Sequence, residues 1–171
     1  MKKILATLFA AGLFMTAGAT AASAEEISPS TCGCVFEEET AWVDGYDYAG
    51  RNWAMYYMYN PDGDNSAVPL VAGRDNVQVG TITFTPSGST MTIQILLMGG
   101  PRFADDDESV KIEYYDYDPM DIKNPAPGKF TYKGSSDGNT WVTVYNLPYD
   151  AAGDNFYGIH SDVLVPVGYQ P

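Results

Sequence analysis

The sequence has 171 residues, with 22 acidic and 9 basic side chains and a formal net charge of −13. A surface with this charge repels phosphate backbones and anionic lipids, so nucleic acid and anionic membranes are excluded as partners. The charge favours cations or basic partners, or it serves solubility alone.

The first 24 residues have the pattern of a secretory signal peptide. Two lysines precede an apolar run over residues 4–14, and the segment ends in an A-S-A sequence at 22–24. These are the parts of an export signal, with cleavage after residue 24. The apolar run is too short for a membrane-spanning helix. We therefore expect a secreted protein, extracellular or periplasmic, with no membrane insertion once residues 1–24 are removed.

Residues 25–34 are expected to be an N-terminal tail, and residues 35–171 a single domain. The tail holds Cys32 and Cys34, the only two cysteines. Three interpretations stay open: a local disulfide, with poor geometry across one intervening residue, a crosslink to a neighbouring molecule, or a pair of metal ligands. A four-ligand metal site lacks obvious further partners, because His160 is the only histidine.

The first part of the domain contains several short strand patterns. Residues 35–43 fit a strand or a turn of helix. Residues 51–59 are rich in aromatics and stop before Asn60-Pro61, which indicates a strand. A further short strand is predicted at 67–71.

Residues 77–100 predict a β-hairpin that supplies the core. In its second arm Met91, Ile93, Ile95 and Leu97 fall on one face and Thr92, Gln94, Leu96 and Met98 on the other, the period of a strand. The break between the arms is predicted at 86–89. In the first arm the apolar phase changes at Gly80-Thr81, which predicts a β-bulge.

The rest of the chain continues the β pattern. Strands are predicted at 110–115 and 155–165, with a long proline-containing loop at 116–128. Residues 130–133 and 140–145 flank a turn and predict a second hairpin. No amphipathic helix is found. The fold class is therefore expected to be all-β, an antiparallel β-sandwich of Greek-key or jelly-roll type.

Acidic loops are candidates for calcium, because that ion binds carboxylate and carbonyl oxygens. Residues 60–65 resemble the start of an EF-hand loop, but Asn65 replaces the required glycine and Val71 the required acid, so EF-hand is rejected. Two interpretations of the acidic loops stay open: a calcium site of looser geometry, or ordinary turns exposed to solvent. The candidate metal ligands are Asp62, Asp64, Asp105, Asp106, Asp107, Asp150 and Asp154.

Trp42, Trp53 and Trp141 are candidates for sugar stacking, with ordinary packing within the sheet as the alternative. His160 is followed by Ser161 and Asp162. On a strand, adjacent side chains point to opposite faces, so these three residues do not form a hydrolase triad. No motif selects a pair of catalytic carboxylates.

Four sequence words lie at residues 39–42 (ETAW), 51–54 (RNWA), 124–128 (NPAPG) and 155–160 (NFYGIH). In this order they resemble the words of a group of uncharacterised secreted β-rich proteins. The resemblance spans most of the chain after residue 24. It implies one exported domain and supplies no catalytic residues.

Two functions are compatible with these features. The first is a secreted non-enzymatic surface or matrix component that self-associates or binds another surface protein, and that binds calcium. The alternative is a carbohydrate-binding module with an aromatic platform for polysaccharide. A hydrolase with two carboxylates is the third and weakest hypothesis.

Overall fold

The computed structural model describes residues 35–50, 52–65, 67–104 and 107–171, which belong to one compact unit. The predicted signal peptide at 1–24 and the tail at 25–34, with Cys32 and Cys34, lie outside the described residues. So do Arg51, Ser66, Asp105 and Asp106.

Strands dominate the described residues, which contain no α-helix, and the all-β prediction is confirmed. The strands are β1 (Phe36–Val43), β2 (Tyr46–Asp47), β3 (Met55–Tyr59), β4 (Val68–Ala72), β5 (Val77–Ser87), β6 (Thr90–Leu97), β7 (Arg102–Phe103), β8 (Val110–Tyr115), β9 (Tyr132–Gly134), β10 (Trp141–Pro148) and β11 (Asn155–Pro166). Two short 3-10 turns, η1 (Pro119–Asp121) and η2 (Pro127–Lys129), lie in and just after the predicted loop. Within the described ranges no helix is long and apolar enough to cross a membrane.

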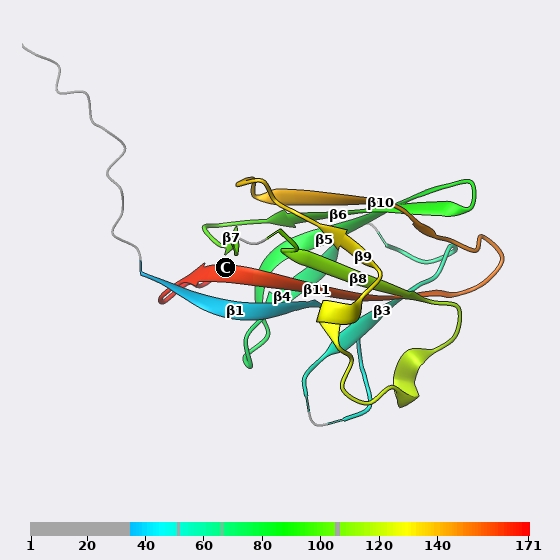
Figure 1. Cartoon of the computed structure of the whole chain (residues 1–171), viewed down its shortest axis with the longest axis horizontal. Coiled ribbons are helices and arrows are strands. Elements are labelled where there is room, and N and C mark those ends of the chain that lie inside the picture. The colour runs from blue at the N-terminus through cyan, green and yellow to red at the C-terminus, as the bar shows by residue number, and fades with distance from the viewer. Residues whose placement is uncertain (1–34, 51, 66, 105–106) are drawn as a thin grey trace, which may run out of the picture. The chain divides into compact units, whose positions relative to one another are not determined.

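All the described strands join one antiparallel sheet (Figure 1). One path through it runs β10-β6-β5-β4-β1-β11-β3-β2. In addition, β7 and β8 pair with β11, and β9 pairs with β8. Strand β11 is therefore the element that joins the two parts of the sheet.

Strand β11 is hydrogen-bonded along both edges. Its residues 160–166 pair with β1 and 155–158 with β3, while 156–161 pair with β8 and 163–164 with β7. Successive side chains of this strand point to opposite faces of the sheet. Both faces are covered, because every residue from Asn155 to Ser161 is buried.

The predicted hairpin at 77–100 is confirmed as β5 and β6, and it supplies much of the main core. The predicted inward face of β6 is buried, with Met91, Ile93 and Ile95 fully inaccessible to solvent. The other strands contribute Ala41, Val43, Leu70, Val79, Ile82, Val110, Ile112, Val142, Val144, Tyr157 and Ile159, among others.

The turn of this hairpin is tighter than the predicted break at 86–89. Ser87 pairs with Thr90, so only Gly88 and Ser89 lie between the strands. Gly88 has a φ of 61°, the left-handed conformation that two-residue hairpin turns require. Pro86 and Ser87 can belong to β5 because both lie at the exposed end of this strand.

The bulge predicted in β5 is confirmed close to its expected position. The register between β4 and β5 shifts where Leu70 pairs with Gly80 and Val71 pairs with Gln78, which leaves Val79 as the extra residue. Val79 and Ile82 are both fully buried although they lie three positions apart. The bulge keeps both side chains on the core side of the sheet.

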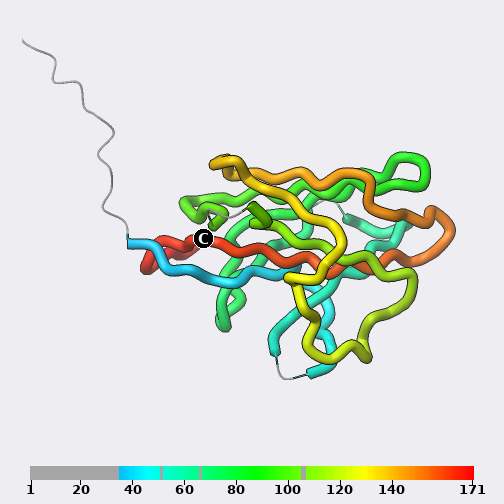
Figure 2. The backbone as a smooth tube through the Cα atoms, in the orientation of Figure 1, coloured from blue at the N-terminus to red at the C-terminus, as the bar shows by residue number. Residues whose placement is uncertain are grey.

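The predicted pairing between 130–133 and 140–145 is wrong. Strand β9 pairs with β8, and β10 pairs with β6. The two strands still approach each other, since a β-carbon on Gly134 would come within 2.6 Å of Val142 Cγ1. Gly134 therefore packs against the side chains of Val142 and Val144 without backbone pairing between β9 and β10. The sheet thus curls around the main core until β9 lies beside β10 (Figure 2).

A second apolar cluster lies on the outer face of β1 and β11. Segments 44–55 and 116–131 cover it. Residues 52–54 belong to this covering layer, where the Tyr48 amide donates to the Ala54 carbonyl at 3.0 Å, so the strand predicted at 51–59 begins only at Met55. The cluster contains Trp42, Tyr48, Ala54, Met55, Tyr56, Val71, Phe130 and Phe156.

We expect Gly80→Ala to lower the free energy of unfolding by about 1–3 kcal/mol, because this is the usual cost of overpacking. A β-carbon at Gly80 would lie 2.4 Å from the Leu96 carbonyl oxygen, so β5 and β6 must separate. Urea unfolding measures the change. Thr81→Ala is the control and should cost less than about 1 kcal/mol. Equal stability of Gly80→Ala and the unmodified protein would contradict the close approach at the bulge.

Candidate functional site

A cleft of about 630 Å³ opens between the outer face of the sheet and the segments that cover the second cluster. Strands β1 and β11 form its floor, and covering loops form its walls. The lining residues are Thr40, Trp42, Asn52, Trp53, Ala54, Arg74, Pro125, Pro127 and His160.

The floor is rigid and aromatic. Trp42 of β1 is only 5% exposed, and its ring centroid lies 4.9 Å from that of His160 on β11 in an edge-to-face contact. The two residues are direct partners in the β1–β11 ladder. Tyr48 and Phe130 also meet Trp42 edge-on, each at 6.3 Å. The floor is therefore fixed by packing before any ligand arrives.

Backbone hydrogen bonds hold the walls over the sheet. The Ala49 amide donates to the Met120 carbonyl at 3.0 Å, which ties the first covering segment to the second. The Tyr56 hydroxyl donates to Asp118 Oδ1 at 2.6 Å and anchors the second segment to β3. Pro125 and Trp53, which both line the cleft, belong to the two segments that these contacts tie down.

The covering layer needs a glycine on β11. A β-carbon on Gly158 would come 2.2 Å from the Tyr48 hydroxyl oxygen, so only glycine lets this hydroxyl approach the strand so closely. The Tyr48 hydroxyl donates to that of Tyr115 at 3.3 Å. Burial and this hydrogen bond raise the pKa of Tyr48 well above its ordinary value, so the ring stays neutral.

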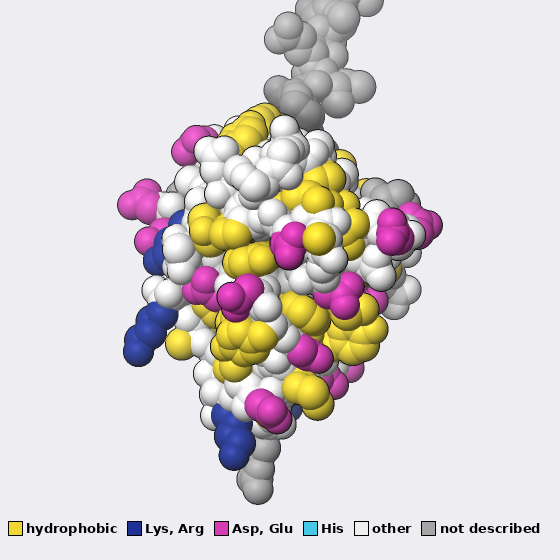
Figure 3. All heavy atoms as spheres, turned by 90° about the vertical axis from the view of Figure 1, so that its right-hand side faces the viewer, with side chains coloured by type: hydrophobic (Ala, Val, Ile, Leu, Met, Phe, Trp, Pro, Cys, Tyr) yellow, Lys and Arg dark blue, Asp and Glu magenta, His cyan; other side chains and the backbone are white. Residues whose placement is uncertain are grey.

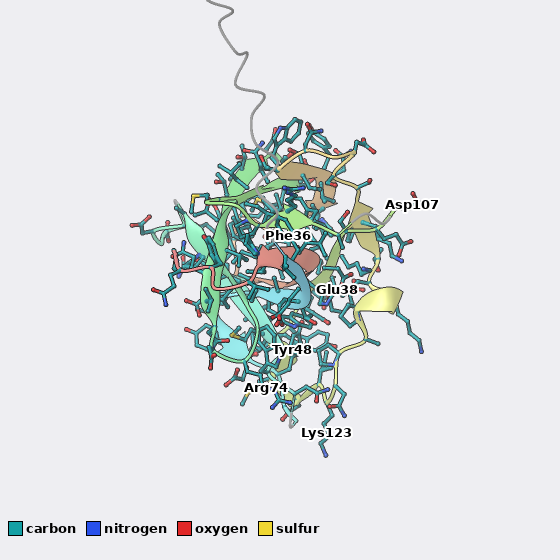
Figure 4. The ribbon with its side chains drawn as sticks, turned by 90° about the vertical axis from the view of Figure 1, so that its left-hand side faces the viewer. Phe36, Glu38, Tyr48, Arg74, Asp107 and Lys123 are labelled. Carbon is teal, nitrogen blue, oxygen red and sulfur yellow. The ribbon has the colours of Figure 1, made fainter. Side chains whose placement is uncertain are left out.

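The charge of the cleft differs from that of the whole chain. Among the described residues that line it, none is acidic, although the chain has 22 acidic residues. Arg74, from the turn between β4 and β5, is exposed at its rim. In Figure 4, Arg74 and Lys123 project at the same end of the molecule, below β1 and β11, whereas Asp107 lies on another side. The described lining of the cleft thus holds no acidic side chain, whereas Glu37, Glu39 and Asp75 share an adjoining pocket with Arg74 at the rim.

Beside the cleft, Asp162 is held by an ion pair rather than by His160. Its carboxylate accepts from Lys111 Nζ. The distance from Asp162 Oδ1 to His160 Nε2 is 3.7 Å, which is too long for a hydrogen bond. Ser161 is fully buried among the main-core residues, on the face opposite His160. The distance from Asp162 to His160 and the position of Ser161 on the opposite face are not those of a hydrogen-bonded triad.

The three predicted stacking tryptophans do not share one platform. Trp42 and Trp53 both line the cleft, but Trp42 is buried in its floor and Trp53 is half-buried in its wall. Trp141 is 47% exposed on β10, on a different part of the sheet. Trp53 is therefore the more accessible of the two tryptophans that line the cleft.

Most of the residues that line the cleft were not selected from the sequence, although nearly all of them belong to the four sequence words. The four words on which the family resemblance depends, at 39–42, 51–54, 124–128 and 155–160, supply every lining residue except Arg74. These words are far apart in the chain and come together only through β11 and the covering segments. The words thus lie in segments that meet at the cleft, although nothing in the sequence showed that these segments would meet.

The acidic loops at 60–65 and 150–155 form the same turn. Asn65 Nδ2 donates to the carbonyls five and two residues earlier at 2.7 and 3.1 Å, and Asn155 Nδ2 does the same at 2.8 and 2.9 Å. The turns are adjacent, because Tyr59 pairs with Asn155. These internal hydrogen bonds account for the asparagines without a bound ion.

The candidate metal ligands are spread over several turns. Asp62 and Asp64 lie in the first of the twin turns, Asp150 and Asp154 in the second, and Asp107 precedes β8. Asp105 and Asp106 lie outside the described residues. In the part of the chain that is described, no three His, Cys, Asp or Glu side chains come close enough together to hold a metal ion. Figure 3 shows acidic side chains scattered among hydrophobic ones over the end it faces.

The fold and cleft define an antiparallel all-β protein with a preformed aromatic recess. Comparison with models of protein families, with curated proteins and with solved structures finds no match for this chain. Functional inference therefore depends on the residues of the site.

We expect Asn155→Ala to destabilise the fold by about 2–3 kcal/mol, because its amide is fully buried and leaves several backbone groups unpaired. Besides its two donated bonds, Asn155 Oδ1 accepts from the Asp150 amide at 2.7 Å. Asn65→Ala, in the more exposed twin turn, is the matched comparison and should cost about 1 kcal/mol. Urea unfolding of both variants measures the difference. Equal costs would contradict the larger structural role of the second turn.

Proposed function

We propose that the protein is an exported, non-enzymatic surface or matrix component that binds a saccharide in the cleft. The export assignment depends on the pattern at residues 1–24. The single observation that supports the binding role is the recess itself, where an exposed tryptophan edge, an arginine, an asparagine and a threonine meet over a rigid floor.

The lining has the chemistry that a sugar requires. Ring faces such as that of Trp53 pack against the apolar side of a pyranose, and polar side chains hold its hydroxyls. Hydrogen-bond donors or acceptors come from three different elements around the cleft, through Asn52, Thr40 and Arg74. Arg74 is the one arginine or lysine in the described lining of the cleft, so a saccharide that carries a carboxylate fits better than a neutral one, although Glu37, Glu39 and Asp75 share an adjoining pocket with Arg74.

We further propose that the fold be classed as an antiparallel β-sandwich. The supporting observation is that β4, β5, β6 and β10 face β8 and β11 across the main core, with apolar side chains from both groups in contact. A Greek-key or jelly-roll assignment remains part of this proposal.

We expect Trp53→Ala to weaken saccharide binding on the order of tenfold, equivalent to about 1.4 kcal/mol. The loss follows from removal of the ring face in the cleft wall. Titration calorimetry with oligogalacturonate as an acidic probe and a dextran oligomer as a neutral one measures the affinities. Trp141→Ala, which lies outside the cleft, is the matched control and should bind as the unmodified protein does.

Arg74→Ala should remove the preference for the acidic oligosaccharide, and Arg74→Lys should restore part of it. Absence of binding to both probes, or an unchanged affinity in Trp53→Ala, would refute the proposed site.

We also propose that calcium binds to the two adjacent acidic turns at residues 60–65 and 150–155. The supporting observation is that Asp62, Asp64, Asp150 and Asp154 lie on adjacent turns. Millimolar calcium should then raise the melting temperature, because a ligand that binds only the native state stabilises it by mass action. Differential scanning fluorimetry in calcium, magnesium and chelator measures the shift, and Asp154→Asn should reduce it. Identical melting in calcium and chelator would eliminate calcium.

Self-association through Cys32 and Cys34 stays a proposal as well, and these residues lie outside the described part of the chain. Its test is the pattern of bands in non-reducing electrophoresis.

A further inference from the structure

The outer face of β5, β6 and β10 forms a continuous surface of small polar and large apolar side chains. The register places Trp141, Leu96 and Thr81 in one row across the three strands, and Thr143, Gln94 and Thr83 in the next. Within the second row, Gln94 Nε2 donates to Thr143 Oγ1 at 3.3 Å. The surface, called here the β10 face, consists of Thr81, Thr83, Thr85, Thr92, Gln94, Leu96, Met98, Trp141, Thr143 and Tyr145.

Several of the most exposed apolar side chains lie on this face. Trp141 is 47% exposed, Tyr145 63%, Leu96 42% and Met98 41%. Soluble monomers rarely gather such side chains on one surface, and tryptophan, tyrosine and methionine are enriched at protein interfaces. The polar partners are threonines and a glutamine, so the face offers hydrogen-bonding groups at its centre.

The β10 face carries no charged residue, whereas the chain as a whole has a net charge of −13. Two copies of this protein repel each other wherever acidic surfaces meet. An uncharged apolar surface is compatible with itself, which is what a two-fold interface requires, since the same patch serves both subunits. The core of a protein interface is likewise depleted in charge.

The edge of β10 is a poor place for a second copy to add a strand. The register shifts between Val144 and Leu147, where Asn146 has a φ of 60°, and the strand ends in Pro148. Bulges and prolines protect sheet edges from pairing with other strands. Contact through the face is therefore favoured over extension of the sheet.

We propose that the β10 face is the interface between two copies of this chain. A face three strands wide measures roughly 10–15 Å by 20–25 Å from standard strand spacing and rise. This is small for a protein interface, so the association is weak and reversible. The site is separate from the cleft, and the two copies keep their clefts free.

Sedimentation velocity of the secreted protein in a reducing buffer tests the proposal, because reduction removes any disulfide crosslink. The sedimentation coefficient should rise from the monomer value to the dimer value as the concentration increases through the micromolar range. Leu96→Glu places a charge in the apolar row and should abolish this rise. Met120→Glu is the matched control: Met120 is 57% exposed in η1, outside the β10 face, and this variant should dimerise normally.

Thr83→Glu provides a second test that removes no apolar group, and it should also give a monomer. Circular dichroism and melting curves establish that each variant is folded. A monomer at every concentration, or a dimer unaffected by both glutamate substitutions, would overturn the proposal. Retention on insoluble cellulose that Trp141→Ala abolishes, with the protein monomeric throughout, would overturn it in favour of a flat saccharide.

Discussion

Pairing of β11 along both edges is the constraint on which the rest of the structure depends. Because the strand is hydrogen-bonded on each side, its alternating side chains enter two separate apolar regions. Tyr157 and Ile159 enter the main core, whereas Phe156 and His160 face the covering layer. One strand thus fixes both the interior and the floor of the cleft, and a change in its register would exchange the two.

The same strand explains why folding and recognition are closely connected here. His160 and its ladder partner Trp42 are positioned by backbone pairing rather than by loop conformation. The walls of the cleft instead depend on side chains that pack on this floor, such as Tyr48 over Gly158. A site of this kind has little to reorganise when a ligand binds, which lowers the entropic cost of binding.

Much of the fold could be predicted from the sequence, because its signals are local. The alternation from Met91 to Leu97 and the phase change near Gly80 each depend on a few neighbouring residues, and both predictions are confirmed. The partner of β9 could not be predicted, because short strands carry little information about pairing over long separations. The cleft was missed for the same reason: Arg74 and Pro125 meet its other residues only after the sheet has curled. Trp141 shows the opposite kind of error. It was grouped with Trp42 and Trp53 by residue type alone, but the fold places it away from them.

The twin turns closed by Asn65 and Asn155 have a consequence for how this protein can vary. Their hydrogen bonds use the side chains of the first and last positions and backbone groups of the first, third and fourth, and the chain itself places Pro61-Asp62 in one copy and Ala151-Ala152 in the other. The side chains at the intervening positions can therefore be replaced without loss of these hydrogen bonds. A reporter group or an affinity handle grafted there would leave β3 and β11 undisturbed.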